Sequence, residues 1–152
     1  MVLLKIAAVF GMGMAVGVMY RIPRQLLFAA SLVGVAAWLV FYFAVSNKMN
    51  IIFGSFLASL TVGFIAELLA RRLRKPATVF TTPGFIPLVP GREAYTTMLH
   101  MVRGEYIEGV ALGMQTLLIA GAIAFGIFLS ATIYRLVINY RLEGGVSHAG
   151  KN

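Results

Sequence analysis

The residues of this chain that could bind a small polar molecule lie around three prolines in the segment 80–95. Pro83, Pro87 and Pro90 interrupt an otherwise apolar run, and each lacks the backbone N–H that a regular helix uses. The run therefore cannot form one regular helix. Broken backbone at membrane depth is tolerated only where protein or a water-filled cavity replaces the missing hydrogen bonds, so we expect this segment to form a binding site.

A new helix is predicted to begin directly after Pro90, at Gly91. The first amides of such a helix and the positive end of its dipole favour a carboxylate or another anion. Arg92 stands next to this opening, and Thr96 shares a helical face with it. These residues predict a site for an anionic or zwitterionic solute. The alternative is an amphipathic surface helix whose charges are simply solvated.

Two glutamates, Glu67 and Glu93, are candidates for coupling transport to an ion. Glu93 belongs to the predicted helix start, whereas Glu67 ends a stripe of small and polar residues in the third apolar run. The stripe consists of Ser55, Ser59, Gly63 and Glu67. A stripe like this faces protein or water and not lipid. Glu67 also lies one turn before Arg71, so it forms either an interfacial ion pair or a proton-coupling site.

Metal, redox and enzymatic chemistry have little support. The chain has no cysteine, and its two histidines, His100 and His148, lie far apart in the sequence without a carboxylate cluster, so we predict no metal site and no cofactor. An enzyme would need converging acid, base or nucleophilic groups. With five acidic residues, mostly in loops, we predict that the chain is not an enzyme.

The elements that position these residues are membrane helices. The chain of 152 residues is 60% hydrophobic and only 12% charged, which predicts an all-α integral membrane protein. We expect about five transmembrane segments, at about 2–20, 25–45, 51–70, 77–91 and 110–138. The fourth is broken by the prolines and followed by a short amphipathic helix. Residues 1–139 form one polytopic membrane domain, and residues 140–152 form a short, Gly-rich tail.

The net charge of +8 indicates an orientation in the membrane, not a nucleic-acid partner, because the basic residues flank the apolar runs. If the segment 77–91 crosses the bilayer, one side carries nine Lys and Arg residues and the other four. If it re-enters and leaves on the same side, the tally is eight against five. The crossing arrangement therefore predicts a multi-pass protein with its N-terminus outside and its C-terminus in the cytoplasm.

The segment from Ile86 to Gly91, Ile-Pro-Leu-Val-Pro-Gly, with Tyr95 four residues later, resembles the signature of the threonine/serine exporter family. The resemblance is to the small membrane subunit, which corresponds to the C-terminal part of the fused exporters. It implies a secondary transporter of the inner membrane that exports threonine and serine or, in split relatives, dicarboxylates such as succinate. It also implies a larger partner subunit, a homo- or hetero-oligomer, and site-forming roles for Pro87, Pro90, Gly91 and Tyr95.

A non-transporting scaffold or assembly subunit is the competing interpretation. Such a subunit would use the glycine-rich helix faces to hold a partner and would need no polar cavity. An exporter needs a hydrated cavity at the proline-rich segment, so the surroundings of that segment distinguish the two.

Overall fold

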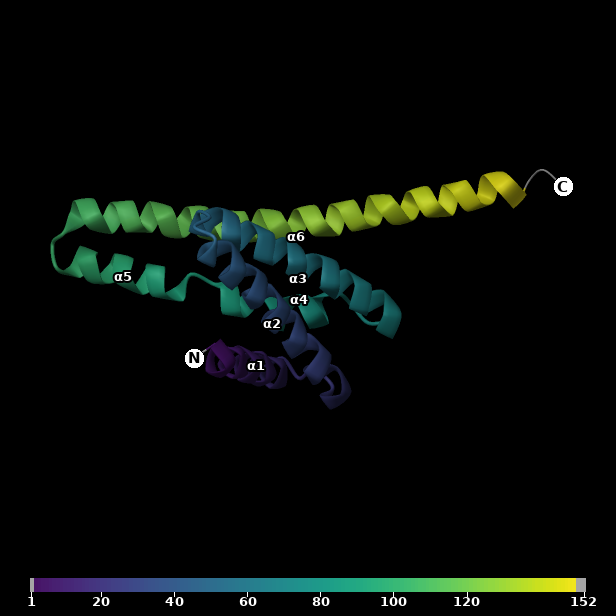
Figure 1. Cartoon of the computed structure of the whole chain (residues 1–152), viewed down its shortest axis with the longest axis horizontal. Helices are drawn as coiled ribbons and strands as arrows, with labels where there is room; N and C mark the ends of the chain where they lie inside the picture. Colours follow the sequence, from purple (N-terminus) through teal and green to yellow (C-terminus); the bar gives the residue numbers. More distant parts are fainter. Residues whose placement is uncertain (1, 150–152) are drawn as a thin grey trace.

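The computed structural model describes the backbone of residues 2–149 and the side chains of residues 2–137. Figure 1 shows a helical bundle crossed by one long helix, which extends beyond it at both ends and pairs at one end with a shorter helix. In chain order the elements are α1 (Val2–Met19), α2 (Arg24–Ser46), α3 (Ile51–Leu73), α4 (Thr78–Phe85), the 3-10 helix η1 (Ile86–Leu88), α5 (Gly91–Val102) and α6 (Tyr106–Ala149). The all-helical fold that the composition predicts is confirmed.

Four helices, α1, α2, α3 and α6, are long and apolar enough to cross a membrane. The segment 77–91 is not among these four, because α4 has only eight residues, about 12 Å of helix against roughly 30 Å of hydrocarbon. The backbone of α6 is helical as far as Ala149, beyond the predicted end of the last span at 138. Its 44 residues extend about 66 Å, so α6 is longer than a bilayer crossing requires.

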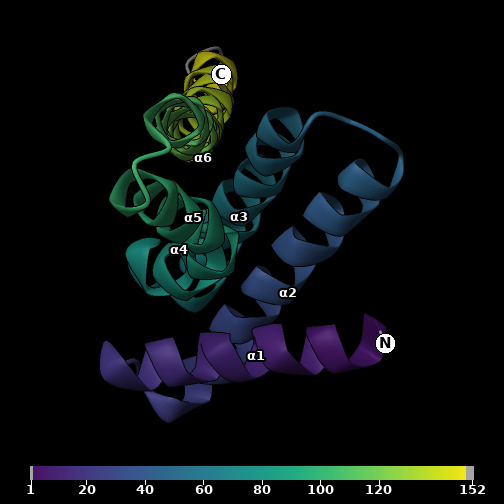
Figure 2. The same ribbon diagram turned by 90° about the vertical axis from the view of Figure 1, so that its left-hand side faces the viewer.

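Helices α1 and α2 pack through small residues. Gly13 of α1 lies against Ser31 of α2, where an added Cβ would meet the Ser31 Cα at 3.1 Å. Ala30 is fully buried, and Figure 2 shows α1 lying across the direction of α6 beneath α2. Ser31 itself donates a hydrogen bond to the carbonyl of Leu27 at 2.9 Å, so its hydroxyl is satisfied within its own helix. Gly13 therefore serves as a packing residue between α1 and α2.

The polar stripe of α3 packs against α6. A Cβ at Gly63 would collide with the Ser130 hydroxyl, and a Cβ at Gly126 would collide with the Ser59 hydroxyl. Ser59 and Ser130 are both fully buried, and each donates to a carbonyl of its own helix. Small side chains on both helices let the two backbones approach closely. The prediction that the stripe faces protein is confirmed for its serines and Gly63.

The proline-rich segment is held inside the bundle. Phe80, Pro83 and Gly84 of α4 are buried, and α4 contacts α1, α2 and α3. In Figure 1, α4, η1 and α5 lead from the end of α3 back past the other end of the bundle, where α6 begins. Pro83 lies within α4 and does not end it, so the expectation that every proline interrupts the helix is wrong at this position.

The tight packing of α6 on α3 makes one pair of substitutions informative. Gly126→Ala places a Cβ 2.9 Å from the carbonyl oxygen of Phe56, a backbone atom that cannot move aside. We expect the free energy of unfolding in mixed micelles to fall by about 1–3 kcal/mol. Gly121→Ala is the matched control, because nothing lies within 4 Å of its added Cβ. Equal stability of the two variants would contradict this packing.

Candidate functional site at the proline break

A small cavity lies where the proline-rich backbone leaves the bundle. Its volume is about 150 Å³, smaller than the roughly 300–1,000 Å³ of sites for drug-sized ligands. Five parts of the chain contribute to its wall: α2, α3, the segment from Pro87 to Pro90, α5 and α6. The lining residues are Trp38, Phe41, Ile51, Ser55, Pro87, Leu88, Val89, Pro90, Glu93 and Ile119.

The two ends of the proline-rich segment have different surroundings. Gly84 packs in a dry position, since an added Cβ would meet Val33 at 2.9 Å and Val62 at 3.0 Å. Pro87 and Pro90, in contrast, line the cavity together with polar side chains. Only the second half of the segment can therefore face a hydrated interior, because the first half is buried among aliphatic side chains.

The backbone break itself lies at Val89 and Pro90. Val89 is extended, with φ −59° and ψ 129°, and Pro90 precedes α5 with φ −75° and ψ 58°. The Gly91 amide donates a hydrogen bond to the Val89 carbonyl at 2.7 Å. No side chain caps the start of α5, so its first turn presents backbone amides close to the cavity, as the sequence predicts.

A glycine of α2 lets the broken segment approach. In a regular helix the carbonyl of Pro83 would accept the amide of residue 87, but Pro87 has no N–H. Gly34 lies against this carbonyl, and an added Cβ would come within 3.2 Å of the Pro83 oxygen and 3.5 Å of the Pro87 ring. The second helix therefore contributes a close backbone contact to the site, which its sequence alone did not indicate.

Two polar side chains enter the cavity wall. Ser55 of α3 is 1% exposed and donates its hydroxyl to the Ile51 carbonyl at 2.8 Å, which leaves the oxygen lone pairs available as an acceptor. Glu93 of α5 is half-buried and is the ionisable residue in the lining. The predicted coupling residue Glu93 thus lies at the cavity, and Ser55 joins it from a different helix.

The other predicted site residues lie outside the wall. Gly91 and Arg92 are exposed, and Tyr95 is 70% exposed. Thr96 is half-buried and donates its hydroxyl to the Arg92 carbonyl at 2.8 Å. A Cβ on Gly91 would meet nothing within 4 Å. These four residues therefore surround the start of α5 without lining the cavity, and their role in binding stays a prediction.

Glu67 is remote from the cavity. It lies 12 positions after Ser55 on α3, about 18 Å along the helix. Among the side chains described up to residue 137, the ion pairs all involve His100 and none joins Glu67 to Arg71. The Arg71 guanidinium instead lies over the Tyr134 ring, 5.1 Å from its centroid. The predicted ion pair is therefore wrong, because α6 provides Arg71 with an aromatic partner.

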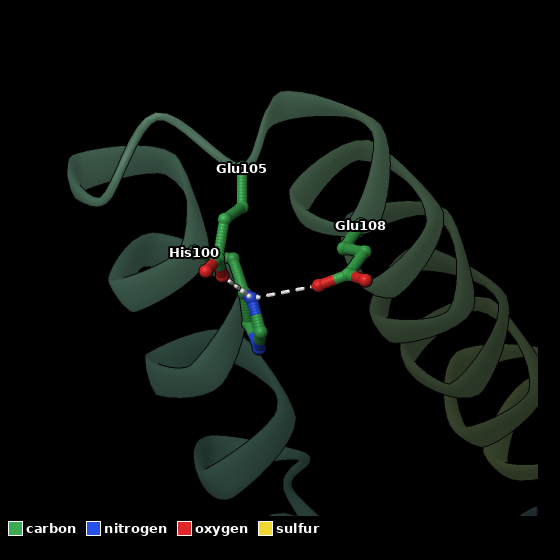
Figure 3. A network of polar contacts seen from close by, with 3 residues as sticks. All are labelled: His100, Glu105 and Glu108. Carbon is green, nitrogen blue, oxygen red and sulfur yellow. Dashed lines mark hydrogen bonds and ion pairs between the residues drawn. The ribbon is translucent and has the colours of Figure 1, made fainter.

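A polar cluster that the sequence did not reveal lies at the turn between α5 and α6. The His100 Nδ1 atom is 2.5 Å from an oxygen of Glu105 and 3.3 Å from one of Glu108, as Figure 3 shows. Gly104 permits this with φ +80°, and the Glu105 amide donates to the His100 carbonyl at 3.0 Å. This glycine-ended turn brings residues of two helices together.

The three donor atoms of this cluster lie within 4.8 Å of one another, close enough to hold one metal ion. The premise that no histidine meets a carboxylate cluster is therefore wrong for His100. Hydrogen bonding between the imidazole and an exposed carboxylate accounts for the arrangement without a metal. None of these three residues lines the cavity at the proline break.

Hydration of the cavity can be measured by single-cysteine labelling, since the chain has no cysteine of its own. Ser55→Cys places a thiol at the cavity, whereas Ser59→Cys places one a turn away against Gly126. We expect a small hydrophilic thiosulfonate to modify Ser55→Cys much faster, because the thiolate forms only in contact with water. Equal protection of both thiols would show a dry cavity.

Comparisons with known proteins show which family the chain belongs to. A curated relative from Haemophilus influenzae (strain ATCC 51907 / DSM 11121 / KW20 / Rd), described as an uncharacterized protein, is 30% identical over 95 residues. These residues cover 57% of this chain and 32% of the relative, so the chain spans about a third of the relative's length. No solved structure matches the chain. The profile of the family described as "Threonine/Serine exporter, ThrE" matches residues 5–133, and the chain therefore belongs to the threonine/serine exporter family.

Proposed function

We propose that this chain is the membrane subunit of a secondary transporter that exports threonine and serine through the cavity at the proline break. The observation that carries the proposal is the position of Glu93, a carboxylate in the wall of a small cavity between membrane helices. Intramembrane ionisable groups commonly mark solute or proton paths. Family membership supports a transporter and not an enzyme.

The charges around the cavity suit a zwitterion. Glu93 attracts an ammonium group, while the first amides of α5 and the nearby guanidinium of Arg92 attract a carboxylate. Ser55 offers an acceptor for the solute's hydroxyl. A dicarboxylate such as succinate would bring a second negative charge towards Glu93, and no lysine or arginine contributes to the lining. This arrangement favours threonine and serine over the dicarboxylates that the resemblance also implied.

Glu93 is also the better candidate for proton coupling. A carboxylate that faces both solute and water can bind a proton in one state of the transporter and an ammonium group in another. Glu67 lies about 18 Å from Ser55 along α3 and does not line the cavity. Coupling through Glu67 would therefore require a second proton-binding site, separate from the cavity.

The chain is expected to act in the inner membrane with a larger subunit of the same family. Support comes from the resemblance of the proline-rich segment 86–91 to the small membrane subunit of split exporters. We place the N-terminus outside and the C-terminus in the cytoplasm; this requires α4, η1 and α5 together to lead back across the membrane, in keeping with their course from the end of α3 to the start of α6 and with the distribution of basic residues. A scaffold without transport would need no carboxylate in a cavity, so the position of Glu93 favours the exporter over that alternative.

The test is efflux of labelled threonine and serine from cells or vesicles that carry the chain with its larger partner. Glu93→Gln keeps the size of the side chain but removes its charge, and we expect efflux to fall by about 100-fold or more, the lower end of what one positioned proton-transfer group contributes to a rate. Glu93→Asp should restore part of the rate. Glu105→Gln is the matched control, an exposed acid on the same hairpin that does not line the cavity.

Membrane insertion and assembly with the partner are measured in parallel for each variant. Unchanged efflux in Glu93→Gln would remove the cavity from the mechanism. Loss of efflux in Glu105→Gln but not in Glu93→Gln would move the function to the turn between α5 and α6. Efflux of succinate without efflux of either amino acid would overturn the substrate assignment.

A further inference from the structure

A second hollow lies between α2 and α3 and is separate from the cavity at the proline break. This groove has a volume of about 470 Å³ and an almost entirely apolar wall. Its lining includes Ala29, Leu32, Val33 and Ala36 of α2 and Ile65 and Leu69 of α3. Leu32 is 47% exposed, so the groove opens on the outer surface of the helix pair, which would face lipid in a membrane.

The groove has the depth of one lipid leaflet. On α2 its wall extends from Ala29 to Leu39, ten residues or about 15 Å of helix. The hydrocarbon core of a bilayer is about 30 Å thick. An acyl chain from one leaflet therefore fits along the groove, whereas a crossing helix of a partner would extend well beyond it.

The walls of the groove end in polar groups. Arg72 follows Leu69 by three positions and Ile65 by seven, so helical spacing places it on the same face of α3. Gln25 precedes Ala29 by four positions on α2. Both polar side chains are exposed. Because α2 and α3 form an antiparallel pair, the groove passes at this end from apolar side chains to a guanidinium and an amide.

The same end of the bundle carries many further positive charges. Its basic residues are Arg21, Arg24, Arg71, Arg72, Arg74 and Lys75. These residues lie in or beside the α1–α2 and α3–α4 links, which are neighbours because Tyr20 and Ile22 share the wall of a small hollow with Thr78 and Thr82. The Arg71 side chain contacts Tyr134. Its neighbour Arg72 is therefore the arginine that lies at the end of the groove.

We propose that this groove binds an anionic phospholipid, with one acyl chain between α2 and α3 and the phosphate at Arg72 and Gln25. The planar guanidinium of arginine matches a phosphate in a bidentate contact, and clustered basic residues between membrane helices attract anionic headgroups. The apolar length, the depth of one leaflet and the charge at one end together fit a lipid and not a soluble ligand.

The test uses the full chain purified in detergent, with its thermal unfolding midpoint measured against added phosphatidylglycerol, phosphatidylcholine or inorganic phosphate. We expect only phosphatidylglycerol to raise the midpoint. Arg72→Gln should weaken its apparent affinity by roughly fivefold, the factor that corresponds to about 1 kcal/mol for one basic residue. Lys48→Gln is the matched control, since it removes one charge at the opposite end of the same helix pair.

A second variant tests the groove itself. Ala36→Phe fills the groove and should abolish the shift, whereas Ala120→Phe adds the same side chain to an exposed position of α6 that does not line it. If Ala36→Phe does not fold, Arg72→Gln decides alone. Equal effects of phosphatidylcholine or phosphate, a full shift in Arg72→Gln, or no shift with any lipid would overturn the proposal.

Discussion

The structure depends on one constraint, which is that a backbone broken by prolines must be enclosed by protein where lipid would leave its polar groups unpaired. Pro83 and Pro87 lie four residues apart, so the carbonyl of the first faces a residue that has no amide. Gly34 brings a helix backbone to within contact of that carbonyl. The surrounding helices therefore serve first to bury the break, and the cavity forms where this enclosure ends.

Close approach of helices makes this enclosure possible. Glycines and serines on α1, α2, α3 and α6 bring the backbones together, and the serine hydroxyls bond to carbonyls of their own helices. Among the described side chains, no buried polar atom lacks a hydrogen-bond partner. A bundle of this kind brings α1, α2 and α3 into contact with α4 and leaves the second half of the proline-rich segment at a small cavity.

The charges are distributed between two distinct regions. Glu93 lies at the cavity, whereas the largest group of basic residues lies at the end of the bundle where α3 leads into α4. The proposed export of small zwitterions would benefit from this separation, because a nearby group of cations would hold the solute's carboxylate and oppose its release. The basic end is instead free to interact with the anionic surface of the membrane.

Much of this architecture was predictable from local sequence. The apolar runs, the small-residue stripes, the amphipathic helix and the break before Gly91 all follow from side-chain chemistry within a few residues. Tertiary packing alone decided which neighbouring residues reach the cavity. Arg92 and Glu93 differ by about 100° around one helix, and only the docking of α5 on α6 turns Glu93 inward. Likewise, Arg71 contacts Tyr134 and not the expected Glu67, and His100 contacts two glutamates across a turn. These contacts join segments whose relative rotation is not specified by any local sequence pattern.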